Sequence, residues 1–250
     1  MLRFLIAILL NAKRGPKIVP TMRKMARHPE KYPEKTRYLY ALRLIRHIMT
    51  SGRITTEVYG TENLPTEGGY VMYPNHQGKY DALGIMYAHH NPCTFVMDKA
   101  KSYGFLVKEL VDLLDAKRLD LRNVRQNMKI MDAITKEVAQ GKRYILFSEG
   151  GYDKNGNRVQ KFKPGSFKCA TKAKVPIVPV TLIDSYLVFN SPKPNYHPVT
   201  TKVIFLKPLY YEDYKDLKTP EIANIVRNKI IDCMKEYGIN YDYTDEIVEA

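Results

Sequence analysis

Cysteine is scarce in this chain: Cys93, Cys169 and Cys233 are the only three, and they lie far apart in the sequence. An odd number of widely spaced cysteines, with no C-x-x-C pair, is not the pattern of a disulfide framework or of a zinc site. We therefore predict three ordinary buried thiols in a reducing compartment.

Long hydrophobic runs are also missing near the N-terminus. The apolar run over residues 4–10 is far shorter than the ~20 residues that a membrane-spanning helix needs. Residues 11–37 then contain nine Lys or Arg against two acidic residues, a composition typical of a segment lying on an anionic bilayer. The alternative is a first helix packed on the core with a solvated basic flank. Residues 36–49 have the apolar stripe of an amphipathic helix, which faces either the core or a bilayer.

Acidic residues are outnumbered, 26 against 40 Lys and Arg, and the formal net charge is +14. Such a chain is attracted to anions, whether nucleic acid, an acidic lipid surface or phosphorylated ligands. The basic residues are scattered, without a helix-turn-helix, zinc-finger or RNP-like pattern. A nucleic-acid-binding module is therefore the remote alternative, and we expect no nucleic-acid partner.

Predicted strands alternate with helices over residues 68–206, which indicates an α/β fold with a largely parallel sheet flanked by helices. The expected strands are 53–60, 68–75, 93–100, 143–150, 175–183 and 201–206, and the expected helices after the N-terminal segment are 104–114, 123–141, 165–174 and 219–238. The prolines of "VPIVPV" (175–180) favour a buried strand near a sheet edge. With no repeat or low-complexity linker, we expect a helical, membrane-associating segment (1–50), one catalytic domain (51–240) and an acidic tail (241–250).

A titratable pair lies in "VMYPNHQGKYDALG" (71–84), where a predicted strand gives way to a helix. In a regular helix His76 and Asp81 would point about 140° apart, because each residue turns the helix by about 100°. They meet only if the chain turns back, which Gly78 makes easier. The carboxylate would then fix the imidazole tautomer and leave the other ring nitrogen free to accept a proton. The alternative is that Asp81 is simply the N-cap of the next helix.

Acidic, glycine and basic residues follow other apolar runs of the chain. Glycines near a helix start expose backbone N–H groups, and basic side chains beside them can hold a phosphate. Each of these signals is weak alone, because most glycines only mark turns and most basic residues are solvated. The candidate substrate-binding residues of this kind are Arg118, Arg122, Glu149, Gly150, Lys161, Lys163 and Gly165.

The order of these segments resembles that of the glycerolipid acyltransferases of the lysophosphatidic acid acyltransferase type, the PlsC-like family. That family is marked by N-H-x-x-x-x-D, a strand with an Arg, F-P-E-G and V-P-[IV]-[VI]-P-[VT]. The matching stretches here are "NHQGKYD" (75–81), "LLDAKRLD" (113–120), "FSEG" (147–150) and "VPIVPV" (175–180). The resemblance spans about residues 55–210 and implies the fold of that family.

The resemblance also implies a mechanism. His76 would remove a proton from an acceptor hydroxyl, with Asp81 orienting the imidazole. The resulting alkoxide would attack the carbonyl carbon of an acyl thioester, and nearby N–H donors would stabilise the oxyanion. The family motifs place Asn75, Arg118 and Glu149 in the substrate site, with Arg118 on the acceptor phosphate.

This reaction needs neither a metal nor a covalent acyl-enzyme, in line with the absence of a G-x-S-x-G elbow and of Cys/His ligand clusters. We expect no cofactor, and acyl-CoA or acyl carrier protein as the acyl donor. The expected acceptor is a lysophospholipid, lysophosphatidate first. The expected partner is an anionic membrane surface, and the expected location is the cell membrane, peripheral or monotopic on the cytoplasmic face.

The third motif departs from the family pattern F-P-E-G-[TS]-R. Ser148 replaces the proline, and Gly151-Tyr152 replaces the Thr-Arg pair, so an arginine often assigned to the acceptor phosphate is missing. Lys161, Lys163 and Arg122 are candidate replacements, although a lysine cannot reproduce a bidentate arginine clamp. An acceptor other than lysophosphatidate therefore stays open: glycerol 3-phosphate, a lyso-glycolipid or an aminolipid.

Overall fold

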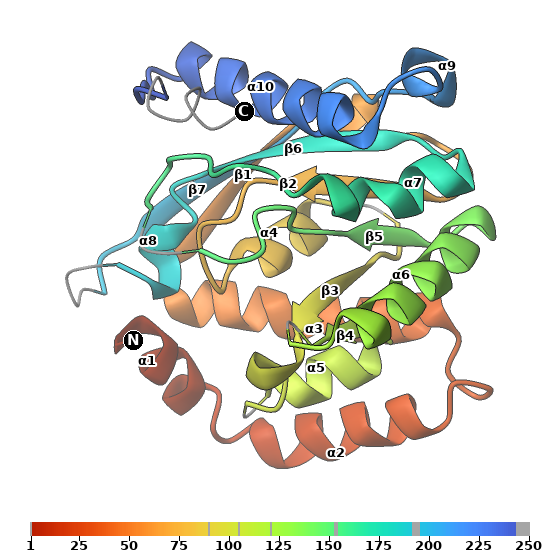
Figure 1. Cartoon of the computed structure of the whole chain (residues 1–250). Helices are drawn as coiled ribbons and strands as arrows, with labels where there is room; N and C mark the ends of the chain where they lie inside the picture. Colours follow the sequence, from red (N-terminus) through yellow and green to blue (C-terminus); the bar gives the residue numbers. More distant parts are fainter. Residues whose placement is uncertain are drawn as a thin grey trace.

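The computed structural model describes residues 2–89, 91–104, 106–120, 122–152, 155–191 and 196–243, and places one sheet between two groups of helices (Figure 1). Seven strands form the sheet in the order β1-β7-β6-β2-β5-β3-β4. Their bounds are β1 (Ile54–Tyr59), β2 (Tyr70–Pro74), β3 (Thr94–Asp98), β4 (Lys117–Leu119), β5 (Arg143–Ile145), β6 (Ile177–Ile183) and β7 (Val199–Phe205). Neighbouring strands from β6 to β4 are parallel, whereas β7 is antiparallel to β6. The predicted α/β fold with a largely parallel sheet is confirmed.

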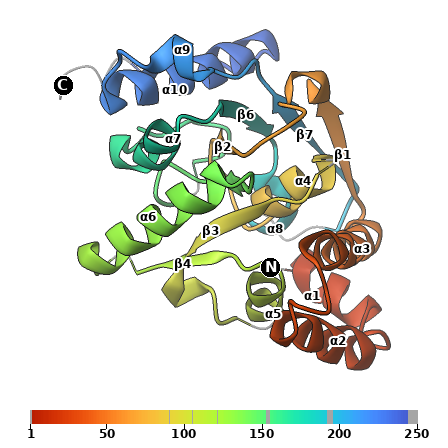
Figure 2. The same cartoon turned by 90° about the vertical axis from the view of Figure 1, so that its right-hand side faces the viewer.

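The helices cover both faces of this sheet (Figures 1 and 2). They are α1 (Leu2–Leu10), α2 (Gly15–Arg27), α3 (Glu34–Gly52), α4 (Asp81–Ala88), α5 (Val107–Leu113), α6 (Val124–Ala139), α7 (Lys168–Ala173), α8 (Tyr186–Phe189), α9 (Tyr211–Tyr214) and α10 (Thr219–Glu236), with short 3₁₀ turns η1 (Thr61–Asn63), η2 (Lys99–Lys101) and η3 (Pro164–Phe167). All of the strands and helices expected after the N-terminal segment are present, some of them shorter.

Strand β2 lies in the interior of the sheet and is buried on both faces. Tyr70 and Met72 belong to the apolar cluster that includes α3, α4 and α5. Val71 and Tyr73, which alternate with them, belong to a second cluster with α6, α7 and α10. A strand covered on both sides has no polar face, which explains its unbroken apolar sequence. It also places the residues after Pro74 at the carboxyl edge of the sheet, where parallel α/β folds position their sites.

The prolines of the "VPIVPV" stretch do not mark a sheet edge, and that expectation is wrong. Strand β6 is fully buried and lies between β2 and β7. It tolerates Pro179 because pairing with the β7 side is interrupted there. An isolated bridge joins Ile177 to Leu209, the regular ladder starts at Val180, and Leu206 donates its N–H to the Pro179 carbonyl. The N–H that proline lacks is therefore not required at this position.

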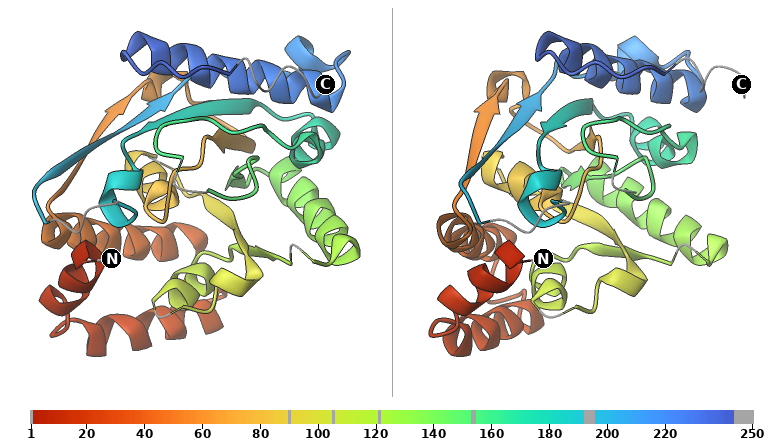
Figure 3. Two further views of the ribbon diagram at one scale, coloured as in Figure 1. Left: turned by 60° about the vertical axis from the view of Figure 1, so that its left-hand side comes forward. Right: turned by 90° about the vertical axis from the view of Figure 1, so that its left-hand side faces the viewer.

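The apolar stripe of α3 faces the core, which decides between the two alternatives left open for it. Tyr38, Ala41, Leu42 and Ile45 are buried in the same cluster as β2. Helix α1 instead lies on the outside, next to α3 and α8 (Figure 3). Buried Arg3 anchors it by donating to the carbonyls of Gly52 (2.6 Å) and His197 (2.8 Å).

Helix α1 exposes leucines on its outer side. Leu5, Leu9 and Leu10 are 52%, 71% and 58% exposed. No helix within the described residues is long and apolar enough to cross a bilayer. The three cysteines are buried, as predicted. Most of the expected acidic tail, residues 244–250, lies outside the described part of the chain.

Candidate active site

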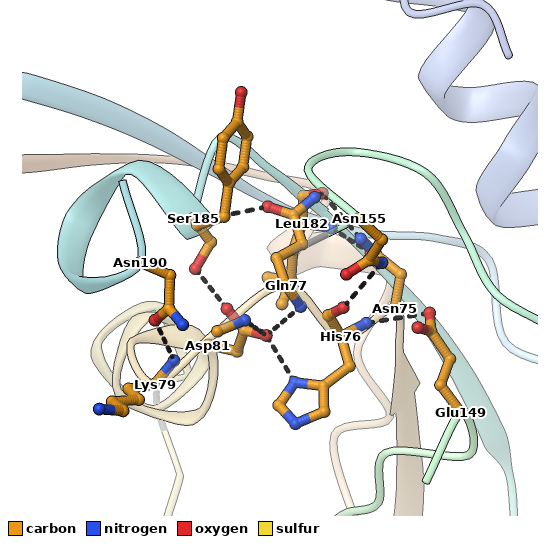
Figure 4. A network of polar contacts seen from close by, with 12 residues as sticks. Asn75, His76, Gln77, Lys79, Asp81, Glu149, Asn155, Leu182, Ser185 and Asn190 are labelled. Carbon is orange, nitrogen blue, oxygen red and sulfur yellow. Dashed lines mark hydrogen bonds and ion pairs between the residues drawn. The ribbon is translucent and has the colours of Figure 1, made fainter. Parts of the chain in front are cut away.

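The chain turns back between β2 and α4, and Asp81 closes this turn. Its Oδ2 atom accepts the backbone N–H groups of Gln77 (2.6 Å) and Gly78 (2.9 Å) (Figure 4). Asp81 is the first residue of α4 rather than its N-cap. Gly78 does not take the left-handed backbone conformation. It is needed because a Cβ atom there would lie 2.8 Å from the Asn190 side chain.

The turn brings His76 and Asp81 together. Nδ1 of His76 lies 2.7 Å from Oδ2 of Asp81, and the Ser185 hydroxyl donates to Oδ1 at 2.5 Å. Asp81 is 0% exposed, so a buried carboxylate accepts all of its hydrogen bonds from protein groups. A carboxylate accepts but does not donate, so Nδ1 carries a proton, and in the neutral imidazole Nε2 has the lone pair. Figure 4 shows Nε2 pointing away from the carboxylate.

Two aromatic rings hold the imidazole from other elements of the fold. Phe147, just after β5, stacks on it with ring centroids 4.1 Å apart and an interplanar angle of 27°. Tyr152 meets it edge-on at 4.6 Å and 80°. The side chain of His76 remains 17% exposed. The ring is therefore fixed in orientation and still accessible at one edge.

Asn75 and Gln77 lie on the buried side of the turn and link it to β6 by hydrogen bonds. Asn75 is fully buried: its amide nitrogen donates to the Leu182 carbonyl (3.1 Å), and its amide oxygen accepts the Leu182 N–H (2.7 Å). This places Asn75 among the supports of the turn rather than against a substrate. Gln77 donates to the same carbonyl (2.7 Å) and to Asn157 (2.9 Å). Sequence reasoning missed Gln77, Asn157 and Ser185, because no motif marks them.

Glu149, at the end of the β5 segment, faces the same turn. Its Oε1 atom accepts the backbone N–H of His76 at 3.0 Å (Figure 4). The residue is 6% exposed, and its buried Oε2 atom has no hydrogen-bond partner among the described residues. Burial disfavours the charged form and raises the pKa of Glu149 to about 8. Glu149 is therefore largely uncharged at neutral pH and supports the main chain of His76.

Lys163 reaches the turn after Glu149. Gly150 has a left-handed backbone (φ +79°), which favours glycine, and the end of the Lys163 side chain lies where a Cβ atom would be. The main-chain N–H of Lys163 donates to the Ser148 carbonyl at 2.9 Å. The Ser148 hydroxyl, in the position of the family proline, bonds to Ser166 (2.8 Å).

Among the described residues, the other candidate substrate-binding residues form no hydrogen bond or ion pair with His76. Lys161 and Gly165 are exposed around the start of η3, and Arg122 is exposed after β4. Arg118 lies on the edge strand β4, three strands from β2, which is about 14 Å at ~4.8 Å per strand. Its guanidinium is already engaged by Asp112 (2.5 Å) and the Ser102 hydroxyl (3.0 Å).

Arg118 also lines a cavity of about 460 Å³ between α2 and α5, whose lining does not include His76. Opposite charges alternate around it: Arg23 pairs with Glu109 (2.6 Å), and Asp112 pairs with both Lys108 (2.6 Å) and Arg118. These pairs occupy the charges of Arg23, Lys108 and Arg118. The structure therefore gives Arg118 a structural ion pair and does not bring it together with the His76 turn.

Known proteins share this arrangement of strands and motifs. Residues 55–183 match the family model described as Acyltransferase. That match covers more than half of the chain, so the protein belongs to this acyltransferase family, and the predicted PlsC-like membership is confirmed. The chain is accordingly an acyltransferase enzyme.

Individual relatives and one solved structure agree with this assignment. The chain is 25% identical over 245 residues to a probable 1-acyl-sn-glycerol-3-phosphate acyltransferase of Mycoplasma pneumoniae, covering 93% of this chain and 87% of the relative. It is 27% identical over 195 residues to 1-acyl-sn-glycerol-3-phosphate acyltransferase alpha of Ovis aries, covering 77% and 67%. The crystal structure of the 1-acyl-sn-glycerophosphate acyltransferase PlsC from Thermotoga maritima has the same fold, with a TM-score of 0.74 and 20% identity over 96% and 98% of the two chains.

Proposed function

We propose that this enzyme transfers a fatty acyl chain from an acyl thioester to the hydroxyl of lysophosphatidate, forming phosphatidate. The names of its relatives support the reaction and the acceptor. The observation that carries the proposed chemistry is the His76 imidazole, held at Nδ1 by a fully buried carboxylate and open at Nε2.

In the proposed mechanism, Nε2 of His76 takes the proton of the acceptor hydroxyl while the oxygen attacks the thioester carbonyl carbon. Asp81 stabilises the imidazolium that forms. The backbone N–H of Gly151 is the candidate donor to the oxyanion, because that of Gly150 donates to the Phe147 carbonyl. The tetrahedral intermediate collapses, the C–S bond breaks, and the thiolate leaves with the proton from the imidazolium. The products are the acylated acceptor and the free carrier thiol, and the imidazole is neutral again.

The test is an acyl-transfer assay with labelled acyl-CoA and acyl carrier protein as alternative donors. We expect His76→Ala to lower kcat by ~10²- to 10⁴-fold, the range of general acid–base catalysis. His28→Ala is the matched control, because His28 also contacts a carboxylate, Glu30 at 3.1 Å, but on the surface after α2. Undiminished transfer by His76→Ala, or no transfer by the wild type, would refute the proposal.

A second acceptor class has specific support in the site. The family arginine is replaced by Tyr152, and Arg118 is engaged by Asp112, so neither arginine is available for a phosphate. Glycerol 3-phosphate, a lyso-glycolipid and an aminolipid are therefore tested as acceptors beside lysophosphatidate. Preferred transfer to an acceptor without a phosphate would replace lysophosphatidate in the proposal.

We also propose that the enzyme works on an anionic membrane surface, through the exposed leucines of α1 and the basic residues that follow. Three exposed basic residues follow Leu10 within two helical turns: Lys13, Arg14 and Lys17. Aromatic contacts connect helix α1 to the site. The ring centroids of Phe4 and Phe189 lie 5.4 Å apart, and those of Phe189 and Tyr80 lie 6.1 Å apart. Tyr80 precedes Asp81 in the chain. A lipid acceptor would then enter from the bilayer beside α1.

Sedimentation with vesicles that contain phosphatidylglycerol tests this location. The triple variant Leu5→Ser, Leu9→Ser, Leu10→Ser should bind at least ~10-fold more weakly, because it removes apolar surface available to the bilayer. Leu39→Ser is the control, since Leu39 is also 55% exposed but lies on α3. Equal binding by the triple variant and the wild type would rule out this surface.

A further inference from the structure

The chain that follows α10 contacts a loop that lies about eighty residues earlier in the sequence. Tyr243 packs against the second apolar cluster, and its hydroxyl accepts the main-chain N–H of Val159 at 3.1 Å. The centroid of its ring lies 5.7 Å from the guanidinium carbon of Arg158. Both contacts fall in residues 155–160, which we call the supporting loop.

Arg227, on α10, holds the same loop. Its Nε atom donates to the Gln160 carbonyl (2.9 Å), and its Nη2 atom donates to the Val159 carbonyl (3.2 Å). The planar fork of a guanidinium suits two successive carbonyls, and here its carbon also lies 4.9 Å from the Tyr243 ring centroid. The C-terminal part of the chain therefore binds both main-chain polar groups of Val159. Arg227 and Tyr243 lie outside the region that the family model matches.

The supporting loop also contacts the turn that carries the imidazole. The Asn155 side-chain nitrogen donates to the His76 carbonyl at 3.3 Å (Figure 4) and to the Arg158 carbonyl at 2.6 Å, which closes the loop on itself. The Asn157 side-chain oxygen accepts from the Gln77 amide nitrogen at 2.9 Å. The loop thus joins the C-terminal part of the chain to the first two residues of the turn.

We propose that Tyr243 and Arg227 are positioning residues, which hold the supporting loop against the turn and thereby keep the His76 imidazole on Asp81. This inference rests on the proposed function. The contacts reach the main chain of the turn, so these residues act through the loop and do not touch the reacting atoms. A displacement of about 1 Å in a catalytic group can cost ~10²-fold in rate, so such a support has a measurable effect on turnover.

Hydrogen exchange tests this coupling without any assay of activity. The main-chain N–H groups of residues 76–78 donate to the Glu149 and Asp81 carboxyl groups, so their exchange reports whether the turn stays closed. In Tyr243→Ala the fragment that contains residues 75–80 should exchange about 5-fold faster or more, as expected for the loss of one hydrogen bond and a packed ring. A fragment from α6 should be unchanged.

Tyr237→Ala is the matched control. Tyr237 comes just after α10 and is 39% exposed, but its ring contacts Tyr59 of β1, with centroids 6.3 Å apart. It removes the same side chain from the same part of the chain without a printed contact to the supporting loop. Exchange of residues 75–80 should match the wild type.

Turnover measures the consequence for catalysis. Tyr243→Ala should lower kcat and kcat/KM to the same extent, about 10-fold, because the acceptor does not contact Tyr243. Tyr243→Phe keeps the ring and loses only the hydroxyl, and Arg227→Lys keeps the charge and loses the fork, so each should lower kcat about 3-fold. A residue that only adds stability would lower the melting temperature and leave kcat unchanged while the chain is folded. Thermal melts show that each variant is folded at the assay temperature.

A double substitution tests whether Tyr243 acts through the loop. Asn155→Ala removes the contact between the supporting loop and the His76 carbonyl. The double variant Asn155→Ala, Tyr243→Ala should then lose little more kcat than Asn155→Ala alone, because both changes interrupt one connection. Losses that multiply would contradict a path through Asn155.

The outcomes distinguish this inference from the proposed function. A wild type without acyl transfer overturns the proposed function alone when Tyr243→Ala still speeds the exchange of the turn, and overturns both when it does not. An active wild type in which Tyr243→Ala leaves either this exchange or kcat unchanged overturns the positioning role alone. Equally fast exchange in the α6 fragment, or in Tyr237→Ala, would show a general loosening of the chain and would also overturn it.

Discussion

Two strand ends meet at the active site, and each supplies one buried carboxyl group in a different environment. After β2, Asp81 accepts four hydrogen bonds, from His76, Gln77, Gly78 and Ser185. After β5, Glu149 accepts the His76 N–H, and burial raises its pKa to about 8. Four donors surround the first carboxyl group, which would stabilise an imidazolium in the proposed mechanism, whereas burial favours the uncharged form of the second.

The substitution with the largest expected effect is Asp81→Asn, which removes the charge of the first carboxyl group. The amide oxygen can replace Oδ2, and the Ser185 hydroxyl can turn to accept from the amide nitrogen, so the turn persists while the charge is lost. We expect kcat to fall by ~10²- to 10⁴-fold with little change in melting temperature, because a neutral amide stabilises an imidazolium far less. The surface variant Asp132→Asn serves as the control. A rate close to wild type would show that Asp81 is needed for the fold alone.

Ser185→Ala tests one of the four donors to Asp81. Removing this buried hydroxyl leaves Oδ1 without its 2.5 Å partner, which should cost about 1–2 kcal/mol of the free energy of unfolding. Activity should fall by about 10-fold at most, because His76, Gln77 and Gly78 still hold Oδ2. Chemical denaturation and the transfer assay measure the two effects. A loss of activity as large as in Asp81→Asn would contradict the idea that four donors together hold the Asp81 carboxylate in place.

Glu149→Gln concerns the pH dependence of stability rather than catalysis, and it tests the other side of the comparison. The folded state keeps the Glu149 proton up to a pKa of about 8, whereas the unfolded state loses it near the ordinary value of 4.5. Between these values the folded state binds more protons, so stability falls as pH rises. One such group contributes a slope of at most about 1.4 kcal/mol per pH unit. In Glu149→Gln this contribution disappears, and the fall in stability between pH 5 and 8 becomes shallower.

Glu137 provides the matched control for that measurement. Burial opposes ionisation there, but hydrogen bonds from Lys117, Lys142 and Tyr144 prevail and lower the pKa of Glu137 to about 2. Its contribution to stability is therefore present above the ordinary pKa of 4.5 and is lost as the pH falls toward 2. Glu137→Gln should leave the slope between pH 5 and 8 unchanged. Equal slopes in Glu149→Gln and the wild type would show that Glu149 is ionised in the folded state.

Much of the architecture could be read from local patterns. The apolar stretches around Val71 and Ile177 indicated strands, and the stripe of α3 indicated an amphipathic helix, with the core and a bilayer both open as the surface it faces. Strand β4 had no such signal, because Lys117, Arg118 and Leu119 are only half-buried and two of the three are charged. The family resemblance alone pointed to it. Pro179 led to the wrong expectation of a sheet edge for a different reason. Whether its missing N–H matters depends on where the β6–β7 ladder begins, which the local sequence does not show.

Within the site, the sequence by itself determined the residue types and their order: an imidazole and a carboxylate five positions apart, a glutamate and a glycine after an apolar strand, and an excess of positive charge. Only the tertiary structure decided which of these residues meet. It brought Ser185 to the turn from the segment after β6, placed Asn75 behind it, and engaged Arg118 with Asp112. Local patterns report burial and backbone preference. The partner of a charge depends on packing between distant segments, which no single stretch of sequence contains.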